Sequence, residues 1–326
     1  MDNPALSSLA NKASNLSQTV VLLIAMALLA GVVGFLLGGT FGLILAIGMT
    51  LFGLFVGQQA SAGIVLRMYK ARPIDPRQAP ELSMIYQQLC DRAGLSTHPR
   101  LYYVPSRIAN AFAVGKGSSS AVAVTDGLMR MMNPREIAGI LAHEITHVRC
   151  RDTSVLGFAD IISRTISAIS RGGLFLMLFG MGEFMQRGAF MFLVTGAVLF
   201  FAPTLAVMLQ LALSRTREFN ADRGAAELTG DPIGLASALA KLERSTGGGF
   251  WKKLLRPGMR RQQPAMLRTH PPTQDRIAAL RGIEQELKSS KPVEPIRIPQ
   301  SRRVVPASVV RVRQRPRYNF LSGLWK

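Results

Sequence analysis

The chain has 326 residues, of which 48% are apolar and 18% are charged, and it carries a formal net charge of +20. Because soluble domains average about 25% charged residues, this composition excludes a disordered protein and argues against an ordinary soluble enzyme. The two cysteines exclude a disulfide scaffold and a four-cysteine zinc site. A chain that is both apolar and basic is expected when a membrane covers its apolar part.

The first predicted element is a membrane hairpin over residues 19–57, which follows an N-terminal segment, 1–18. The range 19–57 has no charged residue, and it is about twice the ~20 residues that one helix needs to cross a ~30 Å hydrocarbon core. Two helices that turn near Gly38, Gly39 and Thr40 fit this length. The alternative is a cleavable signal peptide, which is disfavoured because its apolar region would be only ~7–15 residues long.

A second apolar region, 155–214, predicts another hairpin, inserted in the chain. Its later half, 188–214, has no charged residue and is long enough to span a membrane. Asp160, Arg164 and Arg171 interrupt the earlier half, in which only 172–182 is cleanly apolar, and Glu183 and Arg187 lie in the predicted turn. Charged side chains inside a bilayer are costly unless they face a protein interior or water. The region therefore predicts two further spans, with a buried soluble hairpin as the alternative.

Lysine and arginine gather at the same ends of both predicted hairpins, while the predicted turns hold few or none. The basic residues at these ends are Lys12, Arg67, Lys70, Arg72, Arg77, Arg149, Arg151, Arg164, Arg215, Arg217 and Arg223. Because cytoplasmic loops are enriched in lysine and arginine, these ends are predicted to face the cytoplasm. The sequence thus predicts a multi-pass protein of the cell (inner) membrane whose remaining segments are cytoplasmic.

The segments 68–154 and 215–287 are predicted to be the first and second parts of one folded domain. Apolar spacing and turn residues predict helices over 80–93, 133–148, 215–246 and 273–287, and strands over 100–104, 111–114 and 121–125, the last two as a hairpin. One helix has a marked start, with Asn133 as N-cap, Pro134 at the first position and Glu136 at the third.

The last segment, 288–326, is predicted to be a basic, mostly disordered tail. It holds ten lysines or arginines and five prolines against one acid, Glu294. Such a tail can contact anionic lipid or nucleic acid, or it can be a solvated linker, which is the favoured interpretation. Nucleic-acid binding is not expected, because aromatic residues in the tail are limited to Tyr318, Phe320 and Trp325.

A two-histidine motif carries the chemistry that the sequence predicts. His143, Glu144 and His147 form the pattern His-Glu-x-x-His within the predicted helix 133–148. Residues four apart share one helical face, so the two imidazoles can hold one metal ion while Glu144 sits beside it as a general base. This pattern is typical of zinc peptidases. The alternative is a pair of ordinary helix histidines.

A zinc site for hydrolysis needs a third protein ligand and an open position. Glu218 and Asp222 are four residues apart and are predicted to share a helical face. Glu218 is predicted to complete the site, and Asp222 is predicted to accept a hydrogen bond from a ligand imidazole. Glu227 is predicted to point elsewhere, about 180° away around the helix. The alternative is that these carboxylates form a solvated charged face.

Three segments together resemble the HtpX-type membrane zinc metalloproteases, which are relatives of the CAAX-prenyl endoproteases. They read HEITH from His143, SRTREFNAD from Ser214 and THPPTQDRI from Thr269. The segments NAFA from Asn110 and TDGL from Thr125 are also similar, and the resemblance covers about residues 15–284.

The resemblance implies an α+β, mainly helical fold. It implies a gluzincin-type zinc metallopeptidase domain with a small sheet and transmembrane helices, two N-terminal and two more inserted in the domain. It also implies one Zn²⁺ per chain and cleavage of membrane or misfolded proteins at the cytoplasmic face. The family pattern further implies that Asn110 and His270 steady the tetrahedral intermediate.

These patterns and the resemblance together predict a membrane-embedded zinc endopeptidase. Its expected substrates are membrane or misfolded proteins, in a protein quality-control role. A substrate chain is predicted to add as a strand beside the 111–114 edge, so that backbone recognition dominates. The alternative is a zinc-containing membrane scaffold or adaptor that acts through its basic tail without proteolysis. Glu144 argues against that alternative, because a structural metal site needs no base.

Overall fold

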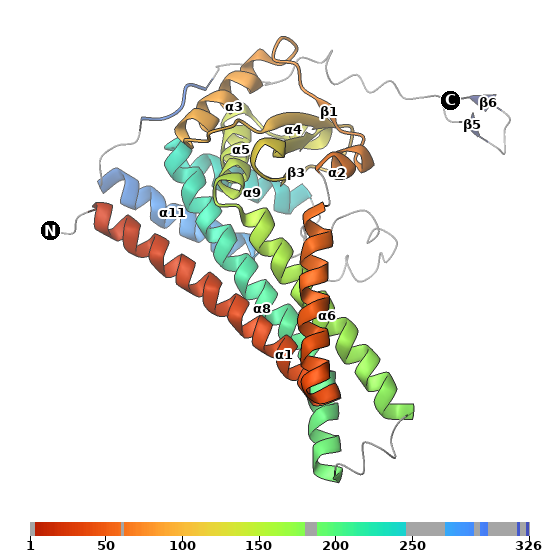
Figure 1. Cartoon of the computed structure of the whole chain (residues 1–326). Coiled ribbons are helices and arrows are strands. Elements are labelled where there is room, and N and C mark those ends of the chain that lie inside the picture. Colours follow the sequence, from red (N-terminus) through yellow and green to blue (C-terminus); the bar gives the residue numbers. More distant parts are fainter. Residues whose placement is uncertain are drawn as a thin grey trace.

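A computed structural model describes residues 4–59, 62–179, 188–245, 271–289, 294–298, 318–319 and 324–325. Long helices extend from one end of a folded unit that holds the sheet and the shorter helices (Figure 1). The helices are α1 (Pro4–Gln59), α2 (Ala62–Met68), α3 (Pro80–Arg92), the short 3₁₀ helix η1 (Gly117–Ser119), α4 (Asp126–Met131), α5 (Pro134–Arg149), α6 (Asp152–Phe179), α8 (Ala189–Thr229), α9 (Pro232–Ser245) and α11 (Thr273–Ser289). The strands are β1 (Arg72–Pro73), β2 (Arg100–Val104), β3 (Ala111–Val114), β4 (Ala121–Thr125), β5 (Tyr318–Asn319) and β6 (Leu324–Trp325).

The first long helix is a hairpin, as its length predicts. Gly38 and Gly39 have non-helical backbone angles inside α1, and Gly39 has φ 58° with ψ −138°, which only glycine adopts readily. The chain reverses there, and its two arms meet at the turn and diverge from it (Figure 1). A Cβ on Gly34 would lie 2.5 Å from the carbonyl oxygen of Gly42, so the arms approach too closely for a larger residue.

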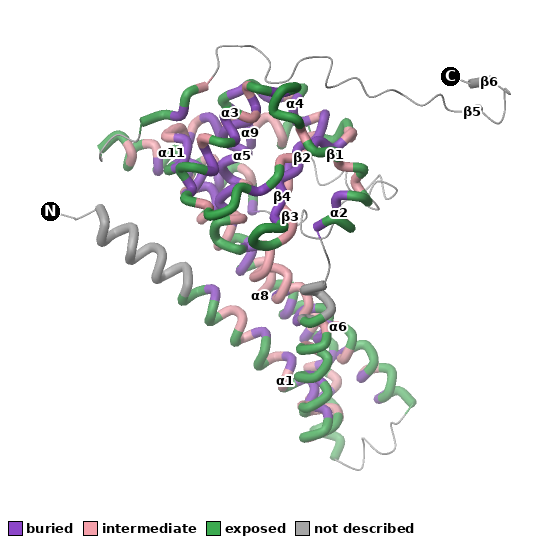
Figure 2. The backbone as a smooth tube through the Cα atoms, turned by 45° about the horizontal axis from the view of Figure 1, so that its top comes forward, coloured by how far each residue is buried: buried purple, intermediate pink, exposed green. Residues whose placement is uncertain are grey.

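Three helices, α1, α6 and α8, are long and apolar enough to cross a membrane. Their facing sides share one apolar cluster, which includes Met26 and Val33 of α1, Ile166 of α6, and Leu199 and Leu213 of α8. Their outward sides stay exposed although they carry large apolar residues (Figure 2). Apolar exposure on this scale is typical of a surface that faces lipid.

The folded unit is built on a four-stranded mixed sheet with the order β1-β2-β4-β3. The predicted hairpin is present, because β3 pairs antiparallel with β4, from Ala111 opposite Val124 to Val114 opposite Ala121. β2 runs parallel to β4, and β3 is at the edge. α5 and α3 cover one face and share the main apolar core, while α2 covers the other face through Leu66.

Helix α5 begins where its residues predict. The Asn133 side chain accepts a hydrogen bond from the backbone N–H of Glu136, and Glu136 accepts one in return from the backbone N–H of Asn133. The buried Glu136 carboxylate also accepts from Ser237 at 2.7 Å and pairs with Lys241 at 2.6 Å, both on α9. The helix start is thereby joined to α9, and the rest of α5 is fixed in the core.

The predicted helix over 215–246 is two helices in the structure. α8 continues without a break from the apolar insert to Thr229, and it ends at Gly230 in the left-handed conformation with φ 67°. Asp231 follows, and α9 starts at Pro232, which cannot continue a preceding helix because it lacks an amide hydrogen. One continuous helix therefore connects the apolar insert to Glu218 and Asp222.

The predicted tail differs from the structure in its first part. α11 extends to Ser289, and residues 294–298 pack against the domain. Ile296 is buried in the main core, and its amide donates to the Thr229 carbonyl. Arg92 donates to the Glu294 carbonyl at 2.7 Å. A contact made by only five residues leaves no periodic pattern in the sequence. The basic, proline-rich composition therefore predicts disorder for this segment although it is ordered.

We expect the tail beyond Ile298 to be dispensable for folding and the part before it to be needed. A chain that ends at Ile298 should unfold at the same temperature as the full chain. A chain that ends at Ser289 should lose roughly 2–5 kcal/mol of stability, because Ile296 no longer fills the core. Thermal unfolding in detergent checks this, with Ile296→Ala in the full chain as the matched control. Equal midpoints for the two truncated chains would contradict it.

Candidate metal centre

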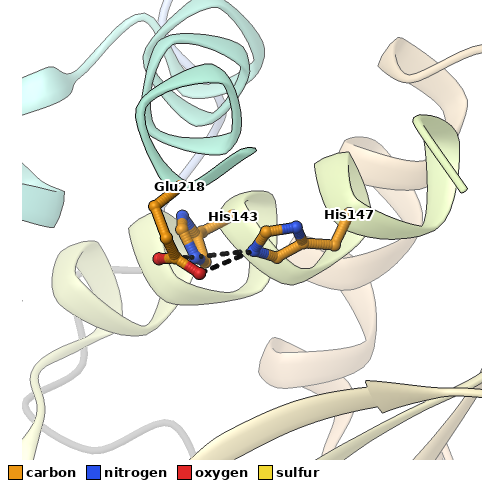
Figure 3. Close-up of side chains that lie close together, drawn as sticks. All are labelled: His143, His147 and Glu218. Carbon is orange, nitrogen blue, oxygen red and sulfur yellow. Dashed lines mark hydrogen bonds and ion pairs between the residues drawn. The ribbon is translucent and has the colours of Figure 1, made fainter. Parts of the chain in front are cut away.

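Three side chains from two helices meet inside the folded unit. His143 and His147 lie one turn apart on α5, and Glu218 points toward both from α8 (Figure 3). The His143 and His147 Nε2 atoms are 3.1 Å apart. The Glu218 carboxylate lies 3.5 Å from His143 Nε2 through Oε2 and 3.6 Å from His147 Nε2 through Oε1. Glu218 and His143 are buried.

Close packing of α5 on α8 brings these side chains together. A Cβ added to Gly224 would lie 2.5 Å from Thr146 Cγ2, so the two helices touch where α8 has no side chain. Thr146 is one residue before His147, and its hydroxyl donates to the Ala142 carbonyl one turn back. The close approach places Glu218 within reach of the histidine face.

The separations between the nitrogen and oxygen atoms of these side chains are close to those of a four-coordinate metal site. Bonds of about 2.0–2.2 Å in a tetrahedral arrangement hold ligand atoms roughly 3.3–3.6 Å apart. In the structure the two Nε2 atoms are 3.1 Å apart, and they lie 3.5 and 3.6 Å from the nearer oxygens of Glu218. Two imidazoles and one carboxylate leave one position open, as in catalytic metal sites.

A carboxylate holds the second ring nitrogen of each histidine. Asp222 Oδ1 lies 3.0 Å from His143 Nδ1, and Asp152 Oδ2 lies 2.8 Å from His147 Nδ1. A carboxylate accepts a hydrogen from Nδ1, which leaves Nε2 with a free lone pair. Both imidazoles therefore present Nε2 to the same point.

Each of these carboxylates is paired with an arginine. Arg276 of α11 donates to both oxygens of Asp222, at 2.6 and 2.8 Å, and its third nitrogen lies 3.1 Å from Glu218 Oε2. Arg217 of α8 lies 3.2 Å from Asp152 Oδ1. The site is thus supported by two chains of contacts, histidine to aspartate to arginine, that approach it from different elements.

The buried carboxylates create a site that favours positive charge. Burial lowers the pKa of His143, but its hydrogen bonds with Asp222 and Glu218 outweigh burial and raise this pKa to about 10. The negative charges of Asp222 and Glu218 stabilise the protonated imidazole of His143, and they would stabilise a bound cation in the same way. A metal ion supplies that positive charge directly, so the donor set fits a metal chemically as well as geometrically.

Sequence reasoning identified Asp222 but missed Asp152, Arg217 and Arg276 as parts of this site. Asp152 reaches His147 because the chain bends sharply between α5 and α6, where Arg151 adopts φ 56°. This conformation is unfavourable for a residue other than glycine, and no residue type in the segment signals it. Arg276 comes from the second part of the domain, and nothing local in the sequence pairs it with Asp222.

The remaining predicted site residues have different positions. Glu144 is half-buried on α5 and lies outside the three-residue cluster. Asn110 precedes β3. Its backbone N–H donates to Thr125 Oγ1, and its backbone carbonyl accepts from the backbone N–H of Thr125. Glu227 is exposed. His270 lies outside the described residues.

Comparisons with known proteins agree with this geometry. Residues 76–284 match the model of peptidase family M48. A protein named Protease HtpX homolog from Campylobacter concisus is 36% identical over 83% of this chain and 98% of its own length. Another of the same name, from Acaryochloris marina, is 39% identical over 80% of this chain and 92% of its own length.

A crystal structure of S. mikatae Ste24p aligns with 83% of this chain and 66% of that chain, at 18% identity and a TM-score of 0.45. The family match spans α3 to α11 and includes all three clustered residues. The family match also includes the apolar helices α6 and α8, and the HtpX homologues extend the likeness to most of the chain. The chain therefore belongs to peptidase family M48, as a membrane metalloprotease similar to the HtpX homologues.

Proposed function

We propose that this chain is a zinc endopeptidase of the cell (inner) membrane that cleaves membrane or misfolded proteins at the cytoplasmic face, in protein quality control. The observation that carries the proposal is the convergence of His143, His147 and Glu218 on one point with both Nδ1 atoms already held. Nitrogen and carboxylate ligands in a four-coordinate site with one open position are typical of catalytic zinc.

In this proposal His143, His147 and Glu218 hold one Zn²⁺. When bound, zinc supplies Lewis-acid chemistry, because it makes water nucleophilic at neutral pH and polarises a carbonyl group. Glu144, next to His143 on α5, accepts a proton from the attacking water and delivers it to the leaving nitrogen. Asp222 and Asp152 keep the two imidazoles in the required tautomer.

The edge strand β3 is the proposed binding site for substrate. It pairs on one side with β4, and in the part of the chain that the structure describes no further strand lies beyond it. It also lies against α5, which carries the two histidines. An extended peptide can hydrogen-bond to such an edge as an added strand. Cleavage would then depend on an unfolded backbone more than on particular side chains, which suits misfolded substrates.

Asn110 and His270 are the proposed donors to the oxygen of the scissile carbonyl. Asn110 directly precedes β3, and its backbone is fixed to Thr125 at 2.8 Å. A donor aimed at a developing oxyanion is worth about 3–4 kcal/mol. For His270 the support is its place in the family motif that begins at Thr269.

Metal-dependent proteolysis tests the proposed function. We expect the purified full chain to cleave casein, to stop when a chelator removes its metal, and to recover when about one equivalent of Zn²⁺ is restored. Metal analysis of the purified protein measures the stoichiometry. A chain that binds zinc tightly but cleaves neither casein nor unfolded membrane proteins would instead support a scaffold that retains zinc without proteolysis.

The proposed orientation follows from the basic residues at the ends of the apolar helices. We expect a reporter that is active only outside the cytoplasm to be silent after Lys70 or Lys326, and active at Gly39 or Arg187. The reporter at Gly39 is the positive control, because it lies at the reversal between the two arms of α1. Reporter activity after Lys70 would contradict the cytoplasmic orientation.

A further inference from the structure

The two chains of contacts that support the histidines differ in where they end. The chain from His143 passes through Asp222 to Arg276, which lies on α11 inside the folded unit. The chain of contacts from His147 passes through Asp152 to Arg217, which lies on the long helix α8.

Arg217 is also joined to the first long helix. One of its terminal nitrogens donates to Thr19 Oγ1 at 2.8 Å, while the other lies 3.2 Å from Asp152 Oδ1. Thr19 is buried and stands at the start of the charge-free stretch of α1. Three contacts therefore connect this helix to His147, although Thr19 and Asp152 are far apart in the sequence.

The side chains that connect α1 to His147 are buried or nearly so. The side chains of Asp152 and Arg217 are 1% and 11% exposed, and Thr19 is 3% exposed. Among the described residues, the buried Nε of Arg217 has no hydrogen-bond partner. The contact of Arg217 with Asp152 Oδ1 is an ion pair without hydrogen-bond geometry, so the hydrogen bond to Thr19 is what fixes the direction of the guanidinium among these described contacts.

We propose that Arg217 is a positioning residue through which the docking of the first membrane helix fixes the orientation of His147. An arginine suits this role because its planar fork can bind two partners at once, whereas a lysine ammonium is a single point charge. With Arg217 bound to Thr19, Asp152 is held beside Nδ1 and His147 Nε2 points at the metal position. The inference rests on the proposed function, because it takes His147 to be a zinc ligand.

The test measures zinc affinity of the full chain in detergent by competition with a chelator. Arg217→Gln should weaken zinc binding about 10–100-fold, as is usual when the group that orients a ligand is lost. Thr19→Val should weaken it by about 3–10-fold, which corresponds to one hydrogen bond. Arg217→Lys should give an intermediate loss, since lysine can keep only one of the two contacts.

A double variant separates this connection from general loosening of the helices. If the effect of Thr19 passes through Arg217, then Thr19→Val should cause no further loss of zinc affinity in the Arg217→Gln background. Two matched controls should bind zinc as the wild type does. Arg215→Gln changes an exposed arginine of the same helix, and Thr50→Val removes a hydroxyl that donates to the carbonyl of Ala46 within its own helix.

The outcomes distinguish this inference from the proposed function. If the wild type binds no zinc, the proposed function itself fails. If the wild type binds zinc and Arg217→Gln binds it equally tightly, only the positioning role is overturned. Equal losses from Thr19→Val in both backgrounds would also overturn it. Should Arg217→Gln fail to accumulate, unchanged affinity in both Thr19→Val and Arg217→Lys would give the same negative answer.

Discussion

Replacing Glu144 with glutamine should lower the rate of proteolysis by at least about 100-fold while zinc remains bound, because general bases contribute about 10²–10⁴-fold to such reactions. Glutamine has nearly the shape of glutamate but cannot accept a proton at neutral pH. Glu144 lies outside the cluster that is proposed to bind the metal, so its loss should leave the three ligands in place. Casein cleavage and metal content, measured on the same preparation, check both parts.

A matched control for this variant is Glu243→Gln, which changes an exposed carboxylate on α9. It should cleave casein at the wild-type rate. Wild-type cleavage by Glu144→Gln would show that another group takes the proton. Loss of zinc from Glu144→Gln would show that Glu144 contributes to the metal site and is more than a base.

Removing the carboxylate of Glu218 should abolish tight zinc binding. Glu218 is the member of the cluster that comes from α8, and without it two histidines on one helix are the remaining ligands. Asp222→Ala should weaken zinc binding by a smaller factor, about 10–100-fold, because Asp222 orients His143 without being a ligand itself. Glu227→Ala should bind zinc normally, since Glu227 is exposed. Metal analysis and chelator competition on the three variants rank these effects.

Asp222→Ala also leaves the buried guanidinium of Arg276 with Glu218 as its remaining carboxylate partner, and breaking a buried ion pair by removing one member costs up to about 3–5 kcal/mol. Its unfolding temperature should therefore fall even in the presence of a chelator, while that of Glu227→Ala should not. Full zinc occupancy in Glu218→Ala, or the strongest loss in Glu227→Ala, would overturn the assignment of the third ligand.

Local features of this fold could be predicted because they depend on neighbouring residues. The N-cap at Asn133, the turn at Gly39 and the β3–β4 hairpin each follow from residue types within a few positions. The alignment of His143 with His147 follows from helix geometry alone. These features need no knowledge of what packs against them.

The rest of the site depends on contacts between distant segments. Arg276 meets Asp222 only because α11 packs on α8, and Arg217 meets Thr19 only because α1 lies beside α8. Ile296 reaches the core from a proline-rich basic segment that gives no periodic signal. Pairings of this kind are set by tertiary packing, which a single sequence does not encode in any local pattern.

The placement of α6 and the apolar first part of α8 between the two halves of the site has a consequence for biosynthesis. The histidines of α5 leave the ribosome before the apolar insert, and Glu218 leaves it only after the insert has been made. The three-residue cluster therefore cannot exist until the chain that enters the bilayer is complete. A nascent chain lacks the complete metal site throughout that interval, so the order of translation itself delays proteolytic activity until all three apolar helices have been synthesised.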